Sequence, residues 1–138
     1  MRLPVVGTTL SALFIYLICM AKPHPLVHGI DLDAQTRCVH YHKVLDIVAI
    51  KMKCCGLYYA CKDCHDSLAD HAIEVWPRGE WDQLAVMCGN CREEISIRQY
   101  LDCTNECPAC KARFNPGCRH HYHFYFATEE VPPEEKAE

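Results

Sequence analysis

Two matched cysteine pairs constrain this chain more than any other feature. Cys88-Gly89-Asn90-Cys91 and Cys107-Pro108-Ala109-Cys110 both read C-x-x-C, and fifteen residues separate them. Two such thiolates can lie on one tight turn, each about 2.3 Å from a shared Zn²⁺, and a second turn completes the tetrahedron. We expect Gly89 to permit an unusual φ and Pro108 to fix φ in these turns. The spacing predicts a structural zinc site rather than unrelated thiols or disulfides.

A second section of the chain contains eight more residues that can bind zinc. They are Cys38, His40, Cys54, Cys55, Cys61, Cys64, His65 and His71. Each of the three histidines completes a cysteine pair, and eight ligands fill two tetrahedral sites. Adjacent residues of an extended chain point to opposite faces, so Cys54 and Cys55 are expected to serve two different metals. Spacing alone leaves the grouping of the ligands open.

Three cysteines lie outside this set of ligands. Cys103 and Cys118 are predicted to be free thiols or one disulfide, and Cys19 is expected to behave as a small apolar residue. With 12 cysteines in 138 residues, the chain has the composition of a cysteine-stapled scaffold. We therefore predict a small zinc-stabilised α+β fold with three zinc sites. It would consist of short strands, zinc knuckles and a ribbon, with little conventional core.

Short regular elements are predicted around the ligands. The predicted strands cover residues 44–52, 57–60, 84–87 and 121–126, the last of them closing an aromatic core. Residues 66–72 have helical character. Residues 95–102 either return as a strand or begin a helix with Ser96 as N-cap. Trp76 and Trp81 are expected to cap the core.

The two ends of the chain differ from its centre. Residues 1–24 form an apolar segment, in which Arg2 precedes an uncharged run that ends at residue 21. This order predicts a targeting segment, a membrane anchor through residues 3–21, or an extension without a role in the mature protein. At the other end, residues 127–138 are predicted to be an acidic disordered tail. That tail accounts for the net charge of −4, so the remainder is balanced and nucleic-acid binding is not expected.

Together the motifs resemble the CHY-type zinc finger family. The resemblance covers about residues 29–126. It rests on Cys38-Val39-His40-Tyr41, Cys54-Cys55, Cys61-Lys62-Asp63-Cys64-His65-Asp66, His71, both C-x-x-C pairs, Phe114-Asn115-Pro116-Gly117-Cys118 and His121-Tyr122. It implies a domain that holds three zinc ions through twelve ligands. Carried over by position, these are Cys38, His40, Cys54, Cys55, Cys61, Cys64, His65, His71, Cys88, Cys91, Cys107 and Cys110.

The chain is most similar to the fungal branch of this family, whose members help small Tim proteins in the mitochondrial intermembrane space. The resemblance implies a zinc-binding assembly factor of the disulfide relay there. Its implied partners are the small Tim proteins and the relay oxidoreductase, which it would keep free of zinc. A thiolate bound to Zn²⁺ is a poor partner for oxidation, which agrees with this role. The secretory pathway or a membrane is the alternative location.

Two other functions stay open at this stage. One is an adaptor module in ubiquitin ligation, although the chain lacks the ligand order of a RING finger. The other is a thiol–disulfide oxidoreductase that uses one C-x-x-C pair. Such pairs usually lie at a helix N-terminus in a βαβ context, which the sequence does not predict. Because four protein ligands close each metal site, we expect the protein not to be an enzyme.

Overall fold

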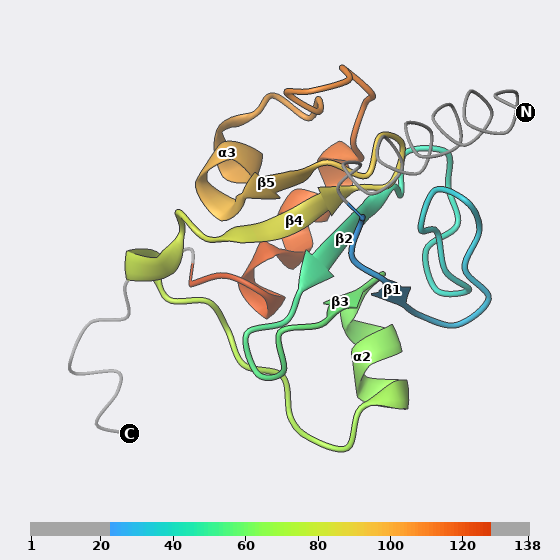
Figure 1. Cartoon of the computed structure of the whole chain (residues 1–138), viewed down its shortest axis with the longest axis vertical. Coiled ribbons are helices and arrows are strands. Elements are labelled where there is room, and N and C mark those ends of the chain that lie inside the picture. Colours follow the sequence, from blue (N-terminus) through green and yellow to red (C-terminus); the bar gives the residue numbers. More distant parts are fainter. Residues whose placement is uncertain (1–22, 128–138) are drawn as a thin grey trace, which may run out of the picture.

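A five-stranded sheet organises residues 23–127, the part of the chain that the computed structural model describes (Figure 1). In spatial order the strands are β1 (Val27–His28), β3 (Tyr58–Tyr59), β2 (Val48–Lys51), β4 (Leu84–Cys88) and β5 (Glu94–Ser96). β1 runs parallel to β3, and all other neighbours are antiparallel. β1 lies just before the predicted domain start at residue 29.

The register of the strands separates two apolar faces. Ile50 pairs with Tyr59 and Val86, and all three belong to the main core. Their neighbours along each strand point to the opposite side, where Ala49, Tyr58 and Met87 pack with Val27 in a smaller cluster. The strands predicted over residues 44–52, 57–60 and 84–87 are confirmed, although β2 begins only at Val48 because residues 43–46 form a turn.

The helix α3 (Ile97–Asp102) and the 3₁₀ helix η2 (Pro116–Phe124) pack with the main core. Both alternatives considered for residues 95–102 occur in succession, since β5 ends at Ser96 and α3 begins at the next residue. The Ser96 hydroxyl accepts from Gln99 N at 3.0 Å, and Gln99 Oε1 accepts from Ser96 N at 2.9 Å. This reciprocal capping box stops the strand and starts the helix.

The strand predicted over residues 121–126 is wrong, because η2 extends to Phe124. Asn115 Oδ1 accepts from Gly117 N at 2.8 Å and Pro116 follows as the first helical residue, so a tight turn starts here and continues as a 3₁₀ helix. The predicted aromatic core does form. The Tyr122 ring lies 5.4 Å from that of Tyr100, and Phe126 is 1% exposed.

The helix predicted over residues 66–72 occurs earlier, as α2 (Lys62–Leu68). Its N-cap is Cys61, whose sulfur accepts from Cys64 N at 3.3 Å. Cysteine is not among the residues that usually cap helices, so the sequence pattern did not reveal this start. The helix ends at Leu68 because Ala69 is extended. A short 3₁₀ helix, η1 (Arg78–Glu80), then leads toward β4.

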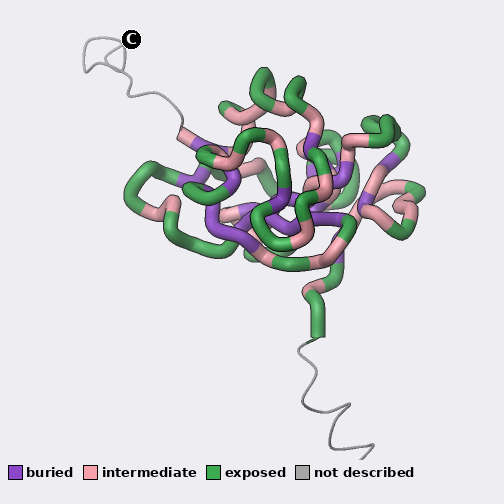
Figure 2. Tube along the Cα trace, turned by 90° about the horizontal axis from the view of Figure 1, so that it is seen from above, coloured by how far each residue is buried: buried purple, intermediate pink, exposed green. Residues whose placement is uncertain are grey.

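Cysteine sulfur forms part of the main core together with aliphatic and aromatic side chains. Five cysteines are at most 4% exposed: Cys38, Cys61, Cys64, Cys88 and Cys107. Trp76 joins this core and donates from Nε1 to Lys51 O at 2.7 Å, while Trp81 packs against its edge, as predicted. Buried segments run through the centre in Figure 2, with exposed loops around them.

Some predictions fall on residues 1–22 and 128–138, outside the described part of the chain. They concern the apolar N-terminal segment, its possible membrane association through residues 3–21 and the acidic tail. Within residues 23–127, no helix is long and apolar enough to cross a membrane.

Candidate metal centres

The structure brings the twelve candidate ligands together in three groups of four. The first cluster is Cys38, His40, Cys61 and Cys64; the second is Cys54, Cys55, His65 and His71; the third is Cys88, Cys91, Cys107 and Cys110. Within each cluster the ligand atoms lie within 4.8 Å of one another. Tetrahedral zinc with bonds of about 2.0–2.3 Å would hold its ligand atoms roughly 3.3–3.8 Å apart. The clusters therefore have dimensions that suit zinc.

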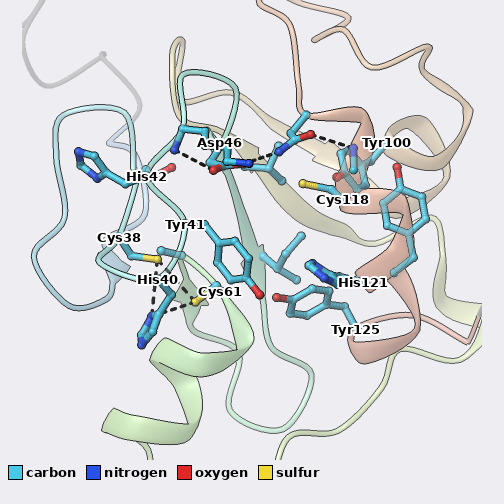
Figure 3. Close-up of a pocket in the computed structure, with 18 of the residues that line it drawn as sticks. Cys38, His40, Tyr41, His42, Asp46, Cys61, Tyr100, Cys118, His121 and Tyr125 are labelled. Carbon is cyan, nitrogen blue, oxygen red and sulfur yellow. Dashed lines mark hydrogen bonds between the residues drawn. The ribbon is translucent and has the colours of Figure 1, made fainter.

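The first cluster joins the start of α2 to the loop after β1. His40 Nδ1 lies 3.4 Å from the sulfurs of both Cys61 and Cys64 and 3.8 Å from that of Cys38. Figure 3 shows the His40 ring directed at the sulfurs of Cys38 and Cys61. Cys38 N donates to Tyr41 O at 3.2 Å, and this turn brings Cys38 and His40 to the same side. Three of the four ligands are buried.

The second cluster lies where the turn after β2 meets the loop after α2, at the lower end of the molecule in Figure 1. His65 Nε2 is 3.3 Å from Cys54 Sγ and 3.3 Å from His71 Nε2, and the two cysteine sulfurs are 4.0 Å apart. His71 Nδ1 donates to Asp70 Oδ1 at 3.0 Å, which leaves Nε2 for a metal.

The prediction that Cys54 and Cys55 serve different metals is wrong. The two residues lie in a turn rather than in extended chain, because Gly56 N donates to Met52 O at 2.7 Å and Gly56 has φ 72°. The adjacent ligands that separate are Cys64 and His65. Neighbouring helical residues point about 100° apart, so one reaches the first cluster and the other the second. The two clusters are thus interleaved in the sequence.

The third cluster consists of the two C-x-x-C turns. Cys88 Sγ lies 3.8 Å from Cys110 Sγ, and Cys91 Sγ lies 3.8 Å from Cys107 Sγ. In each turn the residue after the second cysteine donates its N–H to the carbonyl of the first, Arg92 to Cys88 at 2.8 Å and Lys111 to Cys107 at 2.9 Å. The two turns therefore have matching backbones.

The expected role of Gly89 in these turns needs correction. Positive φ occurs at Arg92 (66°) and Lys111 (69°), not at Gly89. Gly89 is required for space instead: a Cβ there would lie 2.6 Å from Thr36 Oγ1 and 2.8 Å from the carbonyl carbon of Gln35. The third cluster thus packs directly against the loop that leads to Cys38.

A family comparison agrees with this geometry. The family model described as CHY zinc finger matches residues 38–116, which is more than half of the chain and includes all three clusters. The chain belongs to the CHY zinc finger family.

Relatives of this CHY zinc finger match it over most of their length. "Helper of Tim protein 13" of Saccharomyces cerevisiae is 41% identical over 110 residues, which cover 78% of this chain and 93% of the relative. The protein of the same name from Kluyveromyces lactis is 40% identical over 106 residues, or 77% and 92% of the two chains. An uncharacterised Schizosaccharomyces pombe protein is 37% identical over 106 residues, or 77% and 93%.

The buried thiols of the clusters need a bound cation to ionise. Burial raises the pKa of Cys61 and of Cys88 well above the usual range of a thiol. Without metal these thiols would keep their protons, whereas a bound cation favours the thiolate. Cys110 differs, because a 3.4 Å hydrogen bond from Asn90 Nδ2 lowers its pKa to about 6. Sets of sulfur and imidazole ligands are those that Zn²⁺ prefers, so the clusters of this CHY zinc finger fit three zinc ions.

The two remaining cysteines of the described chain are free thiols. Cys103 Sγ donates to Tyr100 O at 3.1 Å. Cys118 lines a cavity of about 350 Å³ between the first cluster and η2, where the Tyr41 and His121 rings lie 5.6 Å apart (Figure 3). In the described residues, no disulfide joins Cys103 to Cys118.

Proposed function

We propose that this CHY zinc finger is a zinc-binding assembly factor for small Tim proteins in the mitochondrial intermembrane space. The observation that carries the proposal is its match to two yeast proteins named Helper of Tim protein 13, over more than nine-tenths of their length. The name supports a role in small Tim import and a mitochondrial location. The ligand chemistry supports zinc as the species that the protein handles.

The proposed role within the disulfide relay is to keep the relay oxidoreductase free of zinc. A dithiol that holds Zn²⁺ cannot be reoxidised readily, because its sulfur electron pairs are bound to the metal. A protein with nine cysteine and three histidine ligands could accept that zinc. The relay oxidoreductase and the small Tim proteins are accordingly the proposed partners.

Catalysis by the clusters themselves is not part of the proposal. Four protein ligands would leave a zinc ion no open position for a substrate or water. Cys61-Lys62-Asp63-Cys64 is a further C-x-x-C pair, and it does begin a helix, contrary to expectation, since Cys61 caps α2. However, Cys61 is 4% exposed and Cys64 is fully buried, and burial raises the pKa of both thiols. An exposed thiolate of low pKa, as oxidoreductases use, requires the opposite environment.

A zinc and thiol inventory followed by a transfer assay tests the proposal. Protein purified without chelator should hold about three zinc ions, with the nine cluster cysteines protected from alkylation. Partly emptied protein should then take zinc from the zinc-loaded relay oxidoreductase, as measured by native mass spectrometry. The Cys103→Ser variant is the control, since Cys103 belongs to no cluster.

Two outcomes would contradict the proposal at different levels. Protein with no zinc and with paired cysteines would rule out the zinc clusters. A full zinc complement without movement of zinc in either direction would rule out the relay role and leave a purely structural zinc domain.

A further inference from the structure

The three clusters differ in how well their ligands are shielded from solvent. In the first, every cysteine is buried, and in the third, Cys88 and Cys107 are fully buried. In the second, only His65 is buried. Cys54 and Cys55 are half-buried, and the His71 side chain is 36% exposed. An incoming molecule can therefore approach the second cluster along three of its four ligands.

The clusters also differ in how their ligands are anchored. The buried cysteines of the first and third clusters belong to the main hydrophobic core, so their sulfurs cannot move without disturbing that core. The second cluster combines a turn, one helical residue and a loop. His71 lies in that loop beside Asp70, whose side chain is fully exposed. The imidazole of His71 can leave a metal while the packing around α2 stays in place.

The number of thiolates also distinguishes the second cluster from the other two and likewise favours exchange of its metal. It offers two thiolates, which balance the charge of Zn²⁺, whereas the other clusters offer three and four and become anionic. The four ligands of the second cluster together with Zn²⁺ carry no net charge, so they repel an approaching thiolate less than the anionic clusters do, and the Asp70 carboxylate beside His71 is exposed to solvent. The third cluster has additional hydrogen bonds to sulfur, from Asn90 Nδ2 to Cys110 and from Ala109 N to Cys107, both at 3.4 Å. Such outer contacts hold a metal more firmly, whereas the outer contact of His71 in the second cluster is made to Asp70, whose side chain is fully exposed.

We propose that the second cluster is the exchange site through which zinc passes between this protein and a dithiol partner, with His71 as the ligand that leaves first. The inference rests on the proposed function and names the site that carries it out. In the exchange, a partner thiolate forms a sulfur–zinc bond as the bond from His71 Nε2 to zinc breaks. Uptake is the reverse, and His71 displaces a partner thiolate, which leaves with its electron pair. Zinc stays divalent, so nothing is oxidised or reduced.

Timed alkylation of the zinc-loaded full chain tests this assignment. Dithiothreitol serves as the dithiol probe, a coloured chelator reports released zinc, and samples are quenched with N-ethylmaleimide for mass spectrometry. We expect the first zinc to leave together with alkylation of Cys54 and Cys55, while the seven other cluster cysteines stay protected. Initial alkylation within the first or third cluster would overturn the assignment.

Two histidine variants provide a matched comparison, since His71 and His42 are both exposed but only His71 is a cluster ligand. The His71→Ala variant should keep about two zinc ions, with Cys54 and Cys55 free in the purified protein. The His42→Ala variant, which keeps all twelve cluster ligands, should keep the exchangeable zinc and release it at the unchanged rate. Resistance to limited proteolysis confirms that each variant is folded. An unchanged first release of zinc in His71→Ala, or the loss of that release in His42→Ala, would overturn the proposal.

The transfer assay with the relay oxidoreductase distinguishes this inference from the function on which it rests. If Cys54 and Cys55 open first toward dithiothreitol but no zinc passes to or from the oxidoreductase, the exchange site stands and the relay role fails. If zinc does pass while Cys54 and Cys55 stay protected, the relay role stands and the exchange site fails.

Discussion

Gly89 lies in the first C-x-x-C turn, where the chain passes the loop at Gln35 and Thr36. Its N–H donates to Ile47 O at 2.6 Å, and the neighbouring Asn90 Oδ1 accepts from Gln35 Nε2 at 2.9 Å. Thr36 is 2% exposed. A side chain at position 89 would meet backbone and a buried hydroxyl, neither of which can move aside easily. One residue thus couples the third cluster to the loop that carries the first.

The Gly89→Ala variant is expected to unfold at a lower temperature than the wild-type protein. Forcing a methyl group into such a contact costs about 1–3 kcal/mol. Thermal unfolding of the zinc-loaded protein measures the effect. Gly79→Ala is the matched control, because no atom lies within 4 Å of a Cβ at that position. Equal melting temperatures of the two variants would contradict the packing argument.

At the scale of elements, the junction between β5 and α3 depends on Ser96. The residue is 9% exposed, and its hydroxyl and backbone N–H both form hydrogen bonds with Gln99. Tyr100, one turn into α3, packs against Phe114, Tyr122 and Phe126. The cap therefore sets the direction in which α3 leaves the sheet and delivers Tyr100 to the aromatic core.

The Ser96→Ala variant should lose about 1 kcal/mol of unfolding free energy, the typical effect of removing an N-cap side chain. Urea unfolding of the zinc-loaded protein measures the loss. Ser67→Ala, at an exposed position of α2, is the control and should change the unfolding free energy by less than about 0.5 kcal/mol. A loss no larger than that of the control would show that the capping box does not stabilise the junction.

At the scale of the whole molecule, cysteine ligands of the metal clusters are also residues of the hydrophobic core. Cys107 is fully buried within the main core, whereas Cys103 packs against it and belongs to no cluster. Loss of one ligand therefore removes zinc and leaves polar groups in the core. In small zinc domains, binding free energy is also folding free energy.

The Cys107→Ser variant is expected to hold about two zinc ions instead of three and to be cleaved faster by protease around the two C-x-x-C turns. Cys103→Ser, the control, should hold the wild-type amount of zinc. Zinc analysis and limited proteolysis provide the two readouts. Retained proteolytic resistance in Cys107→Ser would refute the coupling between the third cluster and folding.

Acidification should release zinc, more steeply from the first cluster than from the second. Burial raises the thiol pKa of Cys61 and Cys64 in the metal-free fold, so zinc must displace their protons. The zinc-bound state, which holds thiolates, loses stability as pH falls and gains it as pH rises. Each displaced proton lowers the apparent affinity about tenfold per pH unit.

The first cluster has three thiols and the second has two. The zinc affinity of the first cluster should therefore fall more steeply than that of the second between about pH 8 and pH 7. Chelator competition at several pH values, combined with alkylation to identify the emptied cluster, measures both slopes. Affinity that stays constant or rises on acidification would contradict the assignment of thiolate ligands.

Sequence alone determined the set of twelve candidate ligands, because zinc ligands must come from a few residue types and the C-x-x-C spacing matches a tight turn. It also determined the central strands, where apolar residues of high strand propensity surround the ligands. Elements whose boundaries depend on cysteine were harder to predict. The start of α2 at Cys61 has no counterpart among ordinary capping preferences, and the aromatic alternation before Phe126 matched a strand although the chain forms a 3₁₀ helix.

Only the tertiary structure decided which ligands share a metal. Cys54 and Cys55 meet because a turn around Gly56 bends the chain, and Cys64 and His65 separate because a helix rotates them apart. The structure likewise decided that the second cluster is the accessible one, since burial depends on which elements cover a side chain. Ligand identity is a property of residue chemistry, whereas grouping and accessibility depend on the path of the backbone between the ligands.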